Sequence, residues 1–291
     1  FRSVEPDWLQ YQSDYIQQVV NLLPPPPTKV IIIHAGDMFD RPDPPASFMS
    51  WCHDNIPEMY VVAGQHDLPS HRLHDLDKSG LGCLIKMQIC HLLHPQKPTY
   101  IEEFNLMLYG FSWEQEVTPL KRQPDDDNLH IAAIHAYIWT KKTGYPGAPE
   151  EKRVKEWNGK LQGYDGVVFG DNHKSFYIDK NTPCPILNNG TFMIRKSDER
   201  THKPTVGLLH QSGKITRHYL NTSQDKYTDY SDLKTIINKD SDLDVGDFIA
   251  ELEALGDQGF DFVNSVKRWC IKNKVEKEVQ ELLLEFVEGG K

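Results

Sequence analysis

The sequence lacks long hydrophobic runs, paired cysteines and an excess of positive charge. No apolar stretch approaches the roughly 20 residues that a membrane span requires, and no signal-peptide pattern opens the chain. The five cysteines are scattered and include no C-x-x-C pair, which argues against a disulfide framework or a structural zinc site. We therefore expect an intracellular, cytoplasmic protein that does not enter a membrane.

Positive charge is scarce, since the 32 lysine and arginine residues are outnumbered by 42 acidic ones, which gives a formal net charge of −10. That balance argues against a protein that coats nucleic acid through bulk electrostatics. It does not exclude a nuclease, because carboxylates that hold metal ions count as negative charge until the ions bind. At 38% hydrophobic and 25% charged residues, the 291-residue chain has the composition of an ordinary globular protein.

Helical and strand patterns alternate along the first part of the chain. Residues 11–23 have the apolar spacing of an amphipathic helix, which ends at four prolines. Short apolar runs at 30–33 and 59–63 indicate buried strands, with a short helix between them at 46–55. The same criteria predict further strands at residues 106–111, 129–134 and 166–170. The order predicts an α/β fold, although residues 81–93 are too mixed to assign.

The second part of the chain predicts a loop, then antiparallel strands and then helices. Residues 140–162 are polar and bear Gly and Pro, so we expect a long loop or lid there, and alternating residues at 183–194 and 205–220 suit antiparallel strands that close the domain. Beyond this point the apolar residues have helical spacing. We expect a domain of residues 1–225 and a helical segment of residues 226–291. The segment is either a cap packed on the sheet or a surface for a partner or for self-association.

Polar side chains follow four of the predicted strands, at the point where each strand ends. Open α/β sheets build active sites from carboxylates at the C-terminal ends of buried strands. A single Asp or His at such a point is more often structural than functional, but four such ends in one α/β sheet argue for a site. The residues at these ends are Asp37, Asp40, Gln65, His66, Asp67, His135, Asp171 and His173.

Carboxylate, imidazole and amide ligands together suit a divalent ion such as Mn²⁺, Fe²⁺ or Zn²⁺. No thiol takes part, which again argues against a structural zinc site. Two ions bridged by one carboxylate would bind a phosphate, lower the pKa of a trapped water and stabilise charge in the transition state. The pattern therefore favours phosphoester chemistry.

The four strand ends carry a resemblance to a known superfamily. In order they read Gly36-Asp37-Met38-Phe39-Asp40, Gly64-Gln65-His66-Asp67, His135 and Gly170-Asp171-Asn172-His173. Over residues 28–220 their order and spacing resemble the GDxxD, GNH[DE], single His and GHxH motifs of the calcineurin-like metallophosphoesterases. The resemblance implies the layered fold of that superfamily, with mixed β-sheets flanked by helices, here followed by the C-terminal helical appendage.

Two further features resemble one branch of that superfamily. The segment from Asn188 to Arg195 and the Gly-Gln-His-Asp-Leu variant at residues 64–68 are similar to the SbcD-type DNA repair exonucleases of the phage and bacterial branch. The resemblance implies a DNA substrate, a coiled-coil ATPase partner of the SbcC type and a homodimer. For a phage-encoded chain, the location would be the host cytoplasm.

The resemblance also implies which residues hold two metal ions. Asp37 would bridge the ions, and His173 would complete the first site. Gln65, His135 and Asp171 would hold the second ion. Mn²⁺ is the ion we expect, with Mg²⁺, Fe²⁺ or Zn²⁺ as alternatives.

The remaining residues would act on the substrate or support the site. His66 would lie beside the scissile phosphate and protonate or stabilise the leaving oxygen, with Asp67 orienting its ring. Asp40 would support the site. Arg195 would contact phosphate or serve a structural role.

The sequence departs from the superfamily's pattern in three ways. The opening D-x-H motif, which supplies two ligands of the first metal, is absent, and we expect that strand to precede Phe1. The alternative is a protein that has lost the first metal. Gln65 replaces an Asn and still offers an amide oxygen, whereas Asp171 replaces a His and makes the second site more negative, which favours Mn²⁺ or Mg²⁺ over Zn²⁺.

Three functions remain open on this reading. The leading one is a metal-dependent phosphodiesterase that acts on DNA. The second is a phosphatase or small-molecule phosphodiesterase, which the acidity of the chain favours. The third is a non-catalytic binding subunit that lacks the first metal.

Overall fold

The computed structural model describes residues 8–24, 29–145, 147–193, 202–210 and 212–223. They belong to a unit that spans Phe1–Asp225, and the predicted helical segment 226–291 lies outside the described residues. The helices are α1 (Trp8–Leu22), α2 (Ala46–Asn55) and α3 (Gly80–Lys86). Short 3₁₀ helices are η1 (Gln65–Asp67), η2 (Pro69–His71), η3 (Leu73–Lys78), η4 (Glu102–Phe104), η5 (Glu150–Lys152) and η6 (Val154–Trp157).

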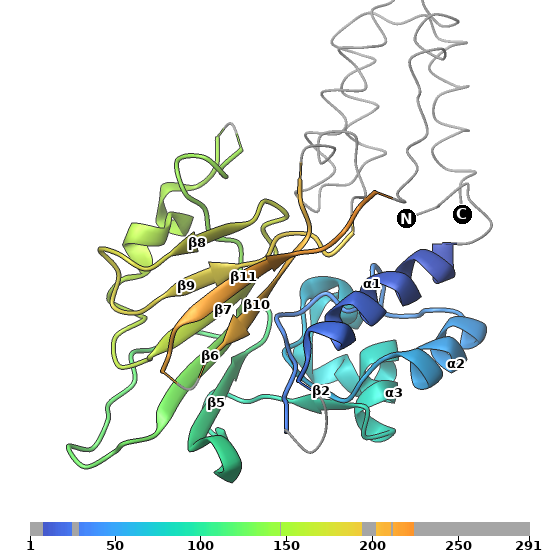
Figure 1. Ribbon diagram of the computed structural model, residues 1–291, viewed down its shortest axis with the longest axis horizontal. Coiled ribbons are helices and arrows are strands. Elements are labelled where there is room, and N and C mark those ends of the chain that lie inside the picture. The colour runs from blue at the N-terminus through green and yellow to red at the C-terminus, as the bar shows by residue number, and fades with distance from the viewer. Residues whose placement is uncertain (1–7, 25–28, 146, 194–201, 211, 224–291) are drawn as a thin grey trace, which may run out of the picture. The chain divides into compact units, whose positions relative to one another are not determined.

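The strands form two sheets and a hairpin (Figure 1). A parallel sheet has the order β1-β2-β3, from β1 (Ile33–His34), β2 (Met59–Val61) and β3 (Cys90–Leu92). A mixed sheet has the order β4-β5-β6-β7-β9-β8, from β4 (Thr99–Ile101), β5 (Leu106–Phe111), β6 (Leu129–His135), β7 (Gly166–Gly170), β8 (Phe176–Ile178) and β9 (Ile186–Asn188). The antiparallel hairpin joins β10 (Thr205–Leu209) and β11 (Ile215–Tyr219). The predicted α/β class with mixed sheets is confirmed.

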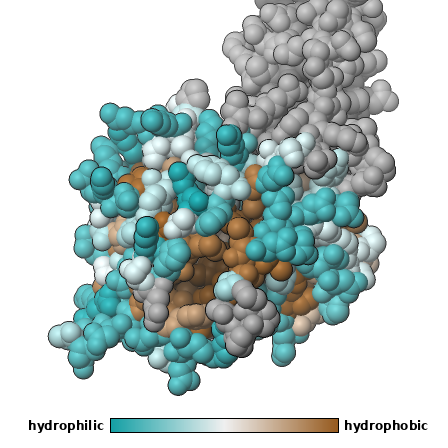
Figure 2. All heavy atoms as spheres, viewed as in Figure 1, coloured by the Kyte–Doolittle hydropathy of each residue, from teal (hydrophilic) through white to brown (hydrophobic). Residues whose placement is uncertain are grey.

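Both sheets are buried on their two faces, which explains the unbroken apolar runs in the sequence. In β2, Met59 and Val61 pack against the core of α2 and α3, whereas Tyr60 packs into the layer between the sheets. In β5, Leu108 faces that same layer and Tyr109 faces a third core on the far side. Figure 2 shows that apolar side chains reach the surface in a hollow between the two sheets on the face viewed.

The structure differs from the predicted elements in four places. The run at 30–33 forms only the short β1, which pairs with β2 at Ile33 and His34. Residues 81–93 divide between α3 and β3. β9 pairs parallel to β7 rather than joining a purely antiparallel closure. The four polar strand ends belong to two sheets rather than one.

None of the described helices has the length and apolar character that would be needed to cross a membrane.

Candidate metal centre

The backbone at the end of β1 is held in an uncommon conformation. Gly36 and Asp37 both have positive φ angles, of 91° and 55°. A Cβ on Gly36 would lie 2.1 Å from Nδ1 of His135, and one on Gly64 would lie 2.0 Å from Oδ1 of Asp37. Asp171, at the end of β7, also has a positive φ angle of 86°. Non-glycine residues seldom adopt this region, and backbone strain of this kind clusters at active sites and ligand-binding loops.

Three of the polar strand ends meet at one point. Ligand atoms of Asp37, His135 and Asp171 all lie within 4.8 Å of one another. Asp37 follows β1 of the parallel sheet, while the other two lie at the ends of β6 and β7 in the mixed sheet. The cluster therefore joins the C-terminal edges of both sheets.

Gln65 joins this cluster through both ends of its amide. Its Oε1 accepts a hydrogen bond from His135 Nε2 at 2.7 Å, and its Nε2 donates to Asp171 Oδ1 at 3.0 Å. Two oxygens therefore point at Nε2 of His135, because Oδ2 of Asp37 lies 3.4 Å from the nitrogen that Gln65 Oε1 contacts. We refer to Asp37, Gln65, His135 and Asp171 as the carboxylate cluster.

The chemistry of the carboxylate cluster fits a divalent cation. His135 donates from Nδ1 to the carbonyl oxygen of Ala35 at 2.7 Å, which directs Nε2 towards the surrounding oxygens. Burial lowers the pKa of His135, but hydrogen bonding and charge from Asp37, with a contribution from Asp171, outweigh it and raise the pKa to about 9. The oxygens of Gln65 and Asp37 thus converge on the Nε2 proton of a buried imidazole. In metal sites of this type, a divalent ion replaces that proton.

Asp37 stays ionised despite being largely buried. Burial raises its pKa, but hydrogen bonding and charge from His135 and His66 outweigh burial and hold it below the ordinary value. The backbone N–H of His66 donates to Asp37 Oδ1 at 3.0 Å, while the His66 side chain is exposed. The imidazole of His66 is therefore open to a substrate beside an anionic cluster.

Asp67 ties the first two strand ends together. Its side chain is fully buried and accepts backbone N–H groups from Gly64 at 2.9 Å, Phe39 at 3.0 Å and Met38 at 3.2 Å. Burial and the charge of Asp37 raise its pKa to about 6 against the opposing effect of these bonds. In the structure Asp67 fixes the two loops, and its predicted action on the ring of His66 stays a prediction.

The loop after β7 is fixed by two buried asparagines, which the sequence analysis named only as parts of longer motifs. Asn172 donates to the carbonyl oxygen of Ile138 at 2.8 Å and accepts the N–H of Lys174 at 3.0 Å. Asn188, at the end of β9, donates to the carbonyl oxygens of Asn172 at 2.7 Å and Lys174 at 3.0 Å. The only sequence signals were that Asn172 lies between two candidate ligands and that Asn188 opens the segment 188–195.

His34 is a third residue to which the sequence analysis gave no role. Its Nδ1 atom is buried without a hydrogen-bond partner among the described residues. Burial, followed by the charge of His135, lowers its pKa to about 4, so it is neutral near the cluster.

The remaining predicted residues are placed as follows. His173 is not among the described Asp and His residues whose ligand atoms converge, and Asp40 is exposed. Arg195 lies outside the described residues. The edge of β1 that faces away from β2 has no partner strand within the described part of the chain.

Comparison with known proteins agrees with this geometry. The family model for calcineurin-like phosphoesterases (Metallophos) matches residues 9–175, which is more than half of the 291 residues. No curated protein matches the chain. The matched range contains every residue of the carboxylate cluster.

Proposed function

Because the chain belongs to the calcineurin-like phosphoesterases, a family of metal-dependent phosphoester hydrolases, we propose that it is a phosphodiesterase that cleaves DNA. The observation that carries the proposal is the convergence of Asp37, His135 and Asp171 within 4.8 Å, with the amide of Gln65 between them. Such a set of oxygen and imidazole ligands suits a hard to borderline divalent ion.

The residues of the carboxylate cluster would together hold metal in this proposal. Gln65, His135, Asp171 and Asp37 would hold one divalent ion, and Asp37 with His173 would contribute to holding a second. Bound ions supply Lewis acidity towards a phosphoryl oxygen and lower the pKa of water. Mn²⁺ is the proposed ion, because two carboxylates among four ligands make the site hard and negative.

His66 carries the proton chemistry in this proposal. Its exposed ring lies next in the chain to the ligand Gln65, and its backbone N–H holds Asp37. An imidazole there donates a proton to the leaving oxygen or stabilises its charge. Asp67 anchors the loop that carries His66, while Asp40 and Arg195 have supporting roles.

The proposed DNA substrate rests on sequence features of one branch of the family. Residues 64–68 and 188–195 resemble the SbcD-type exonucleases, and the resemblance carries with it a coiled-coil ATPase partner of the SbcC type and a homodimer. Residues 226–291, with their helical spacing of apolar side chains, are the proposed contact for either.

The test is digestion of linear DNA in the presence of Mn²⁺ by the full-length chain and by the His66→Ala variant. We expect the wild type to degrade DNA, EDTA to abolish the activity, and the variant to lose about 10²- to 10⁴-fold in rate, the usual contribution of general acid–base catalysis. The variant should still bind Mn²⁺, since His66 contributes its backbone rather than its ring to the cluster. Equal rates for the two proteins would contradict the assignment.

A small-molecule phosphodiesterase is the second candidate, and the net charge of −10 favours it. A polyanionic substrate approaches an acidic protein less readily than a small ester does. Hydrolysis of a chromogenic phosphodiester without any digestion of DNA would decide for this candidate.

A further inference from the structure

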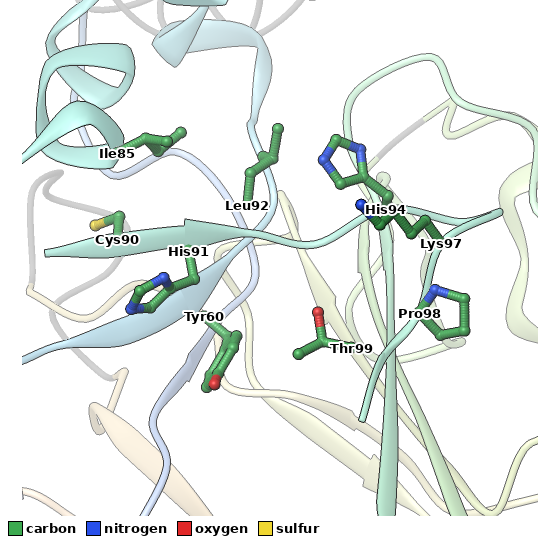
Figure 3. A pocket seen from close by; sticks show the side chains of 9 residues that line it. All are labelled: Tyr60, Ile85, Cys90, His91, Leu92, His94, Lys97, Pro98 and Thr99. Atoms are coloured by element: carbon green, nitrogen blue, oxygen red, sulfur yellow. The ribbon is translucent and has the colours of Figure 1, made fainter. Parts of the chain in front are cut away.

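A cavity of about 590 Å³ lies where edge strand β3 of the parallel sheet faces edge strand β4 of the mixed sheet. Its lining includes no residue of the carboxylate cluster. Figure 3 shows Tyr60 and His91 on one side of the cavity, His94 and Lys97 on the other, and Thr99 between them. The volume falls within the range of about 300–1,000 Å³ that is usual for small-molecule sites.

One end of the cavity carries two basic side chains. His94 and Lys97 are exposed, and neither side chain forms an ion pair or hydrogen bond with another described residue. Thr99 adds a hydroxyl group to the same lining. In a chain with a net charge of −10, an ammonium and an imidazole left without acidic partners favour an anionic ligand.

The edge of β3 adds backbone donors. The N–H of Leu93 donates to Val61, and the carbonyl oxygen of Ile89 accepts from Met59, so the odd-numbered residues of β3 face β2. The N–H and C=O groups of Cys90 and Leu92 therefore point to the open edge, which offers donors alongside acceptors. No strand among the described residues pairs with that edge, and such sheet edges form concave anion sites.

The other end of the cavity is aromatic. The rings of Tyr60 and His91 lie with their centroids 5.3 Å apart at an angle of 38°. Glu58 fixes His91 through a 2.7 Å contact between its Oε1 and Nε2 of the imidazole. The carboxylate of Glu58 repels an anion from this end, so the negative charge of a ligand is favoured beside Lys97. The two rings can then stack on a planar group of the same ligand.

From this arrangement we propose that the cavity is a second binding site, for a nucleoside monophosphate, with the phosphate at His94 and Lys97 and the base against Tyr60 and His91. Aromatic side chains stack on nucleobases with little regard to sequence. The site is separate from the carboxylate cluster and does not depend on DNA being the substrate of that cluster.

The test is equilibrium binding of deoxyadenosine 5′-monophosphate to the full-length protein in EDTA, which removes any contribution from bound metal. Lys97→Gln should weaken binding about tenfold, as expected for loss of a charge-assisted hydrogen bond. Lys180→Gln is the matched control, because it changes the net charge equally and lies in the exposed loop between β8 and β9, at the opposite edge of the mixed sheet. We expect it to bind as the wild type does.

Two further measurements separate the ends of the ligand. Tyr60→Leu keeps an apolar side chain in the layer between the sheets. It should weaken binding of the nucleotide about tenfold and leave binding of inorganic phosphate unchanged. Deoxyadenosine, which lacks the phosphate, should bind more weakly than the nucleotide. Absence of saturable nucleotide binding, equal affinities of Lys97→Gln and Lys180→Gln, or equal affinities for the nucleotide and deoxyadenosine would each overturn the proposal.

Discussion

At the scale of single residues, Gly64 and Asp37 are packed so closely that a side chain at position 64 has no space. A Cβ there would lie 2.0 Å from Oδ1 and 2.5 Å from the backbone N of Asp37. We expect Gly64→Ala to displace the carboxylate and to lower Mn²⁺ affinity at least about tenfold, as moving a metal-orienting group does. Titration calorimetry on metal-stripped protein measures this.

Gly159→Ala is the control for that substitution, because a Cβ at position 159 meets no atom within 4 Å. It should bind Mn²⁺ as the wild type does. If Gly64→Ala and Gly159→Ala bind the ion equally well, Asp37 is not held where the structure places it or is not a ligand.

The sequence alone identified the residues that meet in the carboxylate cluster, because each follows a strand whose apolar run is easy to recognise. The role of Asn172 and Asn188 was not predicted, since their side chains bind carbonyl groups that only the folded loops bring within reach. His34 was missed for a similar reason. Its position inside an apolar run indicates burial, but only the packed structure shows an unpartnered Nδ1 atom near His135.

At the scale of elements, Arg122 fastens the segment before β6 to the start of β7. Its Nη1 lies 2.9 Å from both carboxylate oxygens of Asp165, and its Nη2 donates to the carbonyl oxygens of Asp126 at 3.0 Å and Asn128 at 2.8 Å. Arg122→Lys keeps the positive charge but loses the planar guanidinium group that makes these hydrogen bonds. We expect the free energy of unfolding to fall by about 2 kcal/mol. Urea unfolding measures it.

This substitution should leave the rate of phosphoester hydrolysis unchanged, because Arg122 contacts the N-terminal ends of β6 and β7, and the carboxylate cluster lies at their C-terminal ends. Arg41→Lys is a matched control, since its exposed contact with Asp43 spans 3.6 Å and such surface pairs contribute about 0.2–1 kcal/mol. If Arg122→Lys is as stable as Arg41→Lys, the hydrogen bonds of the Arg122 guanidinium group contribute little to the free energy of unfolding.

Element boundaries were predictable where helical or strand periodicity was strong, and less so elsewhere. The helix at 46–55 and the strands at 106–111 and 166–170 match α2, β5 and β7. Residues 81–93 could not be assigned, because α3 and β3 are short and each buries only part of its surface. Parallel pairing of β9 with β7 was also missed, since it depends on strand order rather than on local residue pattern.

At the scale of the whole molecule, acid stability depends in part on Asp126. Hydrogen bonds from the side chain and backbone of Asn128, with a contribution from His130, lower its pKa from 3.8 to about 2. A carboxyl whose folded pKa is depressed stabilises the protein above pH 3.8, and this stabilisation is lost as the pH falls towards 2. The thermal midpoint of Asp126→Asn should therefore fall less steeply than that of the wild type over this interval.

Asp125→Asn serves as the control for these thermal midpoints at low pH, because Asp125 is the exposed neighbour of Asp126 in the chain. Its thermal midpoint should follow the wild type from pH 5 to pH 2. Parallel curves for all three proteins would mean that Asp126 is not the group whose protonation weakens the fold.

The central claim is that the ends of strands from two sheets build one divalent-metal centre, and the most direct measurement is calorimetric titration of metal-stripped, full-length protein with Mn²⁺. Asp171→Asn removes one charged ligand at constant shape, and Asp179→Asn makes the same change at an exposed position. We predict saturable binding by the wild type and by Asp179→Asn, and an affinity at least about tenfold lower for Asp171→Asn. Equal Mn²⁺ affinity in all three proteins, or no saturable binding by the wild type, would contradict the claim.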